Sequence, residues 1–296
     1  MILRQSGKIT EEVYSLGETE LPVFLLMGKK PALFDSGMSF MGPRYLSDLN
    51  KYLGSSERLA YLFLTHSHFD HCGSAAFLKR SVENLKTGAS PLTAETFKKP
   101  NAIKLIQNLN SPFLNPDDPD CEKLIFDSLD IDIVLDDGDE FSLGGDLIFR
   151  AIATPGHTRD SITFYIPRLK AIIPGEAVGV YDLNYAISPE FLSSYNDYMA
   201  SLDKLAGLDI ELIMMSHVFI LTGIDAKGYI RKSIERTKEF RQEILDYLDE
   251  FNGDREAVKN KIFKEDYKDS GGAMLQPEAA YLINLEAKIR AVAEGR

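Results

Sequence analysis

The most informative stretch of this chain is Thr65-His66-Ser67-His68-Phe69-Asp70-His71-Cys72-Gly73, which holds three of the chain's five histidines. It directly follows an unalternating apolar segment at residues 60–64, a pattern typical of a strand buried on both faces. The run therefore lies at a strand end or in the loop beyond it, where rigid scaffolds place catalytic groups. Imidazole nitrogens suit zinc and iron, and a carboxylate adds charge to such a site.

The spacing within this run predicts ligands for two metal ions. His66 and His68 alternate along an extended backbone, so their rings face the same side. A turn at Asp70 and His71 can present a second set of ligands beside the first. A surface charge cluster is the alternative, but Cys72-Gly73 and the apolar strand before the run argue against free solvation.

The other two histidines also follow predicted strands. His157 stands after Pro155-Gly156, a pair that favours a tight turn, and His217 follows the apolar strand at residues 212–215. Taken alone, each of them would more often be an ordinary surface or core histidine. Taken together with the run at 65–73, all five histidines lie where strand ends can converge.

Apolar patterning and turn residues organise the rest of the chain. Strands are expected at residues 21–27, 31–34, 60–64, 131–135, 141–143, 147–149, 161–166, 171–173 and 212–215. Helices are expected at residues 43–53, 74–80, 226–251 and 276–292. Residues 88–130 carry five prolines between helical stretches, which predicts an insertion or lid. The order of strands, helix, strands, helix predicts a two-layer β-sheet core with helices outside.

Composition and charge narrow the classes of function. A formal net charge of -12 repels nucleic acid in the absence of a local basic patch, and no apolar run is long enough to span a bilayer. We therefore expect neither nucleic acid nor a membrane as partner. Cys72 and Cys121 are interpreted as unpaired thiols, and the first residues lack the apolar core of a signal peptide, so we expect a cytoplasmic protein.

The motifs resemble those of the metallo-β-lactamase superfamily. The run at residues 65–73 resembles its histidine-rich signature, Thr154-Pro155-Gly156-His157-Thr158 resembles its second motif, and Phe34-Asp35-Ser36-Gly37 resembles its early strand-end motif. The match follows the order and spacing of the motifs over about residues 10–225. The second motif and the helical tail are most similar to the branch that contains glyoxalase II and the quinolone-signal response thioesterase.

This resemblance implies an α/β fold, the four-layer αββα metallo-β-lactamase sandwich, with an added C-terminal helical segment. Residues 1–225 would form the catalytic domain, with a lid insertion at 88–130, and residues 226–296 would form the helical extension. An amphipathic helix must bury its apolar stripe, so the extension is expected to cover the site. A homodimer surface is the alternative use of that stripe.

The resemblance also implies two divalent transition metal ions, zinc or alternatively iron or manganese. The implied ligands are His66, His68 and His157 for the first ion, and Asp70, His71 and His217 for the second. Glu176 would take the bridging position, where the family normally has aspartate, and its extra methylene changes its reach. Ser216 and Val218 flank His217 where the family usually has glycine.

A site of this kind supports metal-assisted hydrolysis. A metal-bridging hydroxide, formed because metal lowers the pKa of water from about 15.7 toward about 7, would attack the substrate. Asp70 could orient or deprotonate this nucleophile. We expect a small-molecule acyl substrate, a thioester or an ester. A phosphodiesterase or lactonase on the same site is one alternative. A weakly active, metal-bearing signalling or binding protein is another, favoured by the departures at Glu176 and around His217.

Overall fold

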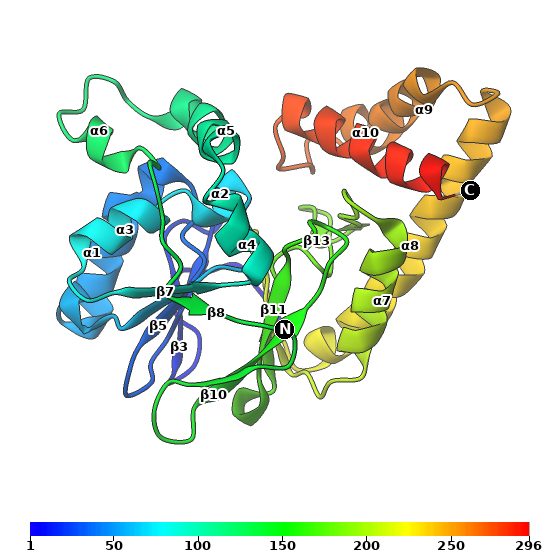
Figure 1. Cartoon of the computed structure of the whole chain (residues 1–296). Coiled ribbons are helices and arrows are strands. Elements are labelled where there is room, and N and C mark those ends of the chain that lie inside the picture. The colour runs from blue at the N-terminus through cyan, green and yellow to red at the C-terminus, as the bar shows by residue number, and fades with distance from the viewer. Residues whose placement is uncertain (296) are drawn as a thin grey trace.

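The computed structural model describes residues 1–295, which form two seven-stranded sheets packed face to face (Figure 1). The strands of the first sheet are, in spatial order, β2 (Gly7–Lys8), β3 (Val13–Leu16), β4 (Val23–Leu26), β5 (Ala32–Phe34), β6 (Tyr61–Phe63), β7 (Lys86–Ala89) and β8 (Ile133–Val134). Those of the second are β1 (Ile2–Leu3), β16 (Ile220–Thr222), β15 (Leu212–Met214), β12 (Ala171–Ile173), β11 (Ile162–Ile166), β10 (Ile148–Ala153) and β9 (Glu140–Ser142). A separate hairpin pairs β13 (Val180–Tyr181) with β14 (Ile187–Ser188).

Aromatic side chains fill the space between the two sheets. Phe34 and Phe63 from the first sheet meet Phe149 and Phe164 from the second, with ring centroids 4.7 Å apart for Phe63 and Phe149. Neighbouring residues on the same strands, such as Leu33, pack on the opposite face against helices. Both faces of the central strands are therefore buried, which explains why their sequences do not alternate between apolar and polar residues.

Helices cover the outer face of each sheet, so the four layers run helix, sheet, sheet, helix (Figure 1). Those on the side of the first sheet are α1 (Gly42–Leu53), α2 (Phe69–Cys72), α3 (Ala75–Ser81), α4 (Pro91–Thr96), α5 (Pro100–Asn110) and α6 (Cys121–Leu124). Those on the side of the second sheet are α7 (Tyr195–Ala206), α8 (Ile224–Glu250), α9 (Arg255–Ile262) with a π-helical turn at Phe263–Lys268, and α10 (Glu278–Glu294). The predicted α/β sandwich with a C-terminal helical segment is confirmed.

Several elements are absent from the expectations based on sequence, among them β3, β16, β7 and α7. The strand β7 is not predicted because Lys86–Ala89 is short and half polar, yet it pairs in parallel with both β6 and β8. The expected insertion at 88–130 thus overlaps β7 by two residues, and its helices begin only at α4. The helix α7 is not predicted either, although Ser194 caps it and Tyr198, Leu202 and Leu205 are buried along one face.

The tail helices bury their apolar stripe within the chain, where α8 packs against β15 and β16 and α10 packs against α7, α8 and α9. Ile244 of α8 and Leu285 of α10 belong to the same buried cluster as Ile172 and Ile213 of the second sheet. The division into a catalytic domain at 1–225 and a helical extension at 226–296 stays a prediction. Both cysteines are free thiols, and no helix among residues 1–295 is long and apolar enough to cross a membrane.

Candidate metal centre

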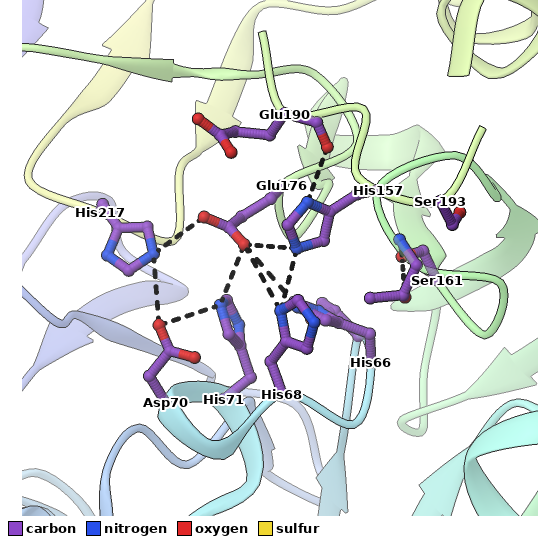
Figure 2. A network of polar contacts seen from close by, with 12 residues as sticks. His66, His68, Asp70, His71, His157, Ser161, Glu176, Glu190, Ser193 and His217 are labelled. Carbon is purple, nitrogen blue, oxygen red and sulfur yellow. Dashed lines mark hydrogen bonds and ion pairs between the residues drawn. The ribbon is translucent and has the colours of Figure 1, made fainter. Parts of the chain in front are cut away.

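The predicted site residues come from loops that follow strands of both sheets and from the short helix α2, which holds Asp70 and His71. His66 follows β6, while His157 and Glu176 follow β10 and β12 of the second sheet. His217 lies in the connection between β15 and β16. The two sheets therefore deliver their loops to one edge of the sandwich, where the side chains point toward one another (Figure 2).

The structure brings all seven predicted ligand residues together in two adjoining groups, within each of which one nitrogen or carboxylate oxygen per residue lies within 4.8 Å of the others. The first group is His66, His68, His157 and Glu176, and the second is Asp70, His71 and His217. Apart from the position of Glu176, this division is the one implied by the sequence resemblance.

Glu176 lies between the two groups. Its Oε2 atom is 2.6 Å from His157 Nε2, 3.8 Å from His66 Nε2 and 3.9 Å from His71 Nε2. Its Oε1 atom is 3.3 Å from His217 Nε2. The carboxylate thus faces ligand atoms of both groups (Figure 2), which is the arrangement that a bridging ligand requires.

Outer hydrogen bonds fix the rings of His66 and His71. Asp35 Oδ2 accepts a hydrogen bond from His71 Nδ1 at 2.9 Å. Asp35 also accepts from the Thr65 hydroxyl, at 3.0 and 2.9 Å to its two oxygens, so Thr65 Oγ1 can accept from His66 Nδ1 at 3.0 Å. One buried carboxylate therefore sets the tautomer of two rings and turns their Nε2 atoms inward. Such outer partners are typical of metal-binding histidines.

Main-chain carbonyls orient two further rings. His157 Nδ1 donates to the carbonyl oxygen of Glu190 at 2.8 Å, and His217 Nδ1 lies 3.4 Å from the carbonyl oxygen of Glu20. In both rings the Nε2 atom then faces Glu176. His68 differs, because its Nδ1 atom points into the cluster, 3.1 Å from His157 Nε2.

Two buried imidazole nitrogen atoms indicate that these residues are suited to bind a metal ion. His66 Nε2 and His71 Nε2 are fully buried and have no hydrogen-bond partner among the described residues. A buried polar atom without a partner is costly, and native structures rarely keep one unless something satisfies it. The cluster offers imidazole nitrogens and carboxylate oxygens, a donor set that suits zinc, iron or manganese. The residues therefore fit the metal centre that the sequence predicts.

Charge in the cluster shifts the pKa values in both directions. Burial lowers the pKa of His66 and takes that of His68 to about 4. Burial would also lower the pKa of His71, but Asp70 and Asp35 outweigh it and raise that pKa to about 9. Burial works against ionisation of Glu176, but His157 and His217 overcome it and hold its pKa well below the usual range. Without metal, this raised pKa favours the form of His71 that is protonated on both ring nitrogens at neutral pH.

The sequence that builds this geometry matches a known family. The model of the metallo-beta-lactamase superfamily matches residues 23–217, about two thirds of the chain, and the match spans every residue of the cluster. The chain belongs to the metallo-beta-lactamase superfamily. The resemblance carried by the motifs at 65–73 and 154–158 is confirmed.

Individual superfamily relatives are distant. The chain is 25% identical over 227 residues to an atrochrysone carboxyl ACP thioesterase from Aspergillus fumigatus, covering 75% of this chain and 54% of the relative. It is 31% identical over 124 residues to a hydroxyacylglutathione hydrolase from Brucella anthropi, covering 40% of this chain and 34% of the relative. The chain thus spans about half and about a third of the lengths of these two proteins.

A solved superfamily structure supports the fold over nearly the whole chain. A metallo-beta-lactamase family protein from Thermus thermophilus superposes with a TM-score of 0.67 at 18% identity. The superposition covers 97% of this chain and 95% of the Thermus protein, so the likeness extends into the C-terminal helices.

The superfamily motifs are held by contacts that sequence reasoning does not anticipate. In the sequence Asp35 stands out only as a strand breaker within a motif, yet it orients His71. Asp160 accepts hydrogen bonds from the Ser67 amide at 3.0 Å and the Thr93 hydroxyl at 2.8 Å, and so anchors the loop from outside. Gly73 allows close packing, because an added Cβ atom would lie 2.6 Å from the amide nitrogen of Ser39.

Proposed function

We propose that this protein is a binuclear metal-dependent hydrolase that cleaves a thioester or ester bond in a small acyl substrate. The observation that carries the proposal is the pair of buried, unpartnered Nε2 atoms of His66 and His71 that face the Glu176 carboxylate. The proposed ligands are His66, His68 and His157 for one ion and Asp70, His71 and His217 for the other, with Glu176 between them.

The chain's own residues divide the work of hydrolysis. When bound, the metal ions would polarise the substrate carbonyl and lower the pKa of a water molecule from about 15.7 toward about 7. Glu176 contributes negative charge between the two groups, and Asp35 keeps the inward nitrogen of His71 unprotonated once metal is bound, because its hydrogen bond holds the ring proton on Nδ1.

Asp70 is suited to a catalytic role. Its Oδ2 atom is 3.8 Å from His217 Nε2 and 4.0 Å from His71 Nε2, and its side chain is 20% exposed. It therefore lies at the open side of the cluster, where a carboxylate can orient an attacking water and accept its proton. Cys72 is not suited to act as nucleophile, because burial raises the pKa of its thiol well above the usual value.

The choice of substrate rests on the superfamily relatives. Two of them bear names that describe a thioesterase and a hydroxyacylglutathione hydrolase, and they match 75% and 40% of this chain. One fold supports many reactions, so this step is an analogy and the reaction needs a direct test. The net charge of -12 further favours a small molecule over a nucleic acid strand.

A kinetic panel tests the proposal. Purified protein loaded with zinc, manganese or ferrous iron is assayed at neutral pH against model thioesters, esters, lactones, phosphodiesters and a β-lactam. We expect the highest kcat/KM for a thioester or ester. A lactone or phosphodiester turned over with a clearly higher kcat/KM than every thioester and ester would overturn the substrate assignment. Absence of turnover by metal-loaded protein in the whole panel would favour a binding or signalling role.

Asp70→Asn serves as the control for contaminating activity. The substitution keeps the shape of the side chain but removes its charge and its capacity to accept a proton. We expect kcat to fall by about 10²- to 10⁴-fold, the usual contribution of a general base. Turnover that is unchanged in this variant would show that the measured activity does not arise at this site.

A further inference from the structure

The C-terminal helix α10 places a buried charge against Glu190, a residue that contacts the metal centre. Lys288 is 3% exposed, and its ammonium group lies 2.8 Å from Glu190 Oε1, a carboxylate that is itself only 4% exposed. Lys288 Nζ also lies 3.4 Å from Ser188 Oγ and 5.9 Å from the centre of the Phe240 ring. Burying an ion pair carries a large desolvation penalty, so such a pair contributes little net stability, and a role other than stability is expected for it.

Glu190 touches the metal centre through its main chain. Its carbonyl oxygen accepts the hydrogen bond from His157 Nδ1 at 2.8 Å, while its side chain extends away from His157 (Figure 2). The carboxylate at the end of that side chain accepts from Lys288 Nζ at 2.8 Å. One residue thus joins a helix of the tail to a proposed metal ligand. Residues 188–190 are the link, because Ser188 Oγ also donates to Glu190 Oε1 at 2.9 Å.

The link controls which nitrogen of His157 faces the cluster. A ring that donates through Nδ1 to a carbonyl carries no proton on Nε2 when neutral, and His157 Nε2 is the atom that lies 2.6 Å from Glu176 Oε2. A shift of the Glu190 carbonyl would turn the ring or release its tautomer. The position of that carbonyl depends on a segment that follows the short hairpin strand β14, and Lys288 anchors its side chain from α10.

We infer that Lys288 is a positioning residue for the metal centre: through its buried pair with Glu190 it holds the carbonyl that orients His157 for metal binding. The inference rests on the proposed metal centre. It assigns the tail helix α10 a part in assembling the site, in addition to the burial of its apolar side chains.

The test separates positioning from stability with two variants. Lys288→Met removes the ammonium group but keeps a long side chain, and it leaves the Glu190 carboxylate buried without a cation. The double variant Lys288→Met with Glu190→Gln also removes that stranded charge and restores stability. If the pair positions His157, the double variant folds with a near-native melting temperature yet binds zinc with a Kd weaker by about tenfold or more, the usual effect of losing an outer partner.

The readouts are the zinc Kd from chelator competition and the visible absorption spectrum of the cobalt(II) form, which reports ligand geometry. We expect both to change in the double variant. Glu286→Gln is the matched control on α10, because Glu286 pairs with Lys259 at 3.4 Å and is 67% exposed. It should change neither readout.

A zinc Kd and cobalt spectrum in the double variant equal to those of the native protein would overturn the inference, even if Lys288→Met alone is unstable. This outcome differs from failure of the proposed function. In that case the native protein itself would bind neither zinc nor cobalt.

Discussion

Replacing Asp35 with Asn changes the metal centre without touching a proposed ligand atom. Asp35 adopts a left-handed backbone conformation, with φ of 61°, which asparagine also tolerates, so the main chain can stay in place. The carboxylate accepts hydrogen bonds from His71 Nδ1 and from the Thr65 amide, at 2.9 and 2.8 Å. An amide has only one oxygen, so it can accept on one side alone.

Either orientation of the new amide creates a conflict. If the amide oxygen faces Thr65, the amide nitrogen donates to His71 Nδ1 and forces the ring proton onto Nε2, where it blocks a metal. If the amide oxygen faces His71, the amide N–H groups point at the Thr65 amide and hydroxyl, which are themselves hydrogen-bond donors to Asp35 in the native protein. Loss of such an outer partner typically weakens metal binding by about 10- to 100-fold. At about 1.4 kcal/mol per tenfold, this corresponds to about 1.4 to 2.8 kcal/mol.

Chelator competition with zinc measures the effect on the Asp35→Asn protein directly. Asp132→Asn is the matched control, because Asp132 Oδ2 accepts from the Thr87 amide at 2.8 Å in the same sheet but belongs to neither ligand group. We expect both variants to lose some thermal stability, but only Asp35→Asn to bind zinc more weakly. Equal zinc affinity of Asp35→Asn and the native protein would refute the view that this carboxylate sets the His71 tautomer.

The same geometry makes three other outcomes measurable. Glu176→Gln should lower metal occupancy and activity together, whereas Glu176→Asp keeps the charge and should retain more of both; unchanged occupancy by elemental analysis in Glu176→Gln would make this carboxylate a bystander. Gly156→Ala should destabilise the fold by about 1–3 kcal/mol and lower zinc affinity, since its Cβ atom would lie 2.3 Å from Tyr198 Cα; a native melting temperature would contradict this. The pKa of His71 is about 9 in the metal-free fold and near 6.5 in the unfolded chain, so protonated His71 stabilises the fold. This stabilisation is complete below about pH 6.5 and is lost as the pH rises through about 9. Zinc must displace that proton, so zinc affinity should rise over the same window, and calorimetry in two buffers should detect proton release at pH 7.

The cluster could be predicted from the sequence because its chemistry is concentrated in a few residues. Histidines are rare in this chain, and three of them fall in one run directly after a buried strand. The apolar strands are equally easy to recognise in the sequence, because strands such as β4, β5 and β6 are buried on both faces and therefore consist of continuous apolar runs. These local signals pointed to a two-layer sheet core and to the five histidines and Asp70, whereas Glu176 and the four-layer sandwich followed only from the resemblance to the superfamily.

The supporting contacts could not be predicted in the same way, because they join positions far apart in the sequence. Glu190 lies in a short connection with no motif, and its carbonyl reaches His157 only through the tertiary fold. Lys288 does leave a signal in the sequence. It is a charged residue on the face of α10 that also carries the buried residues Leu285 and Val292, and such a position calls for a buried partner.

The most direct measurement is the metal content of the protein. Elemental analysis after gentle purification, repeated after stripping and reloading with zinc, ferrous iron or manganese, should give close to two transition metal ions per chain. His66→Ala combined with His71→Ala removes the two nitrogen atoms of the cluster that are buried without a hydrogen-bond partner and should abolish loading. A native protein that is purified without metal and takes up none of the three ions would contradict the assignment of this cluster as a metal centre.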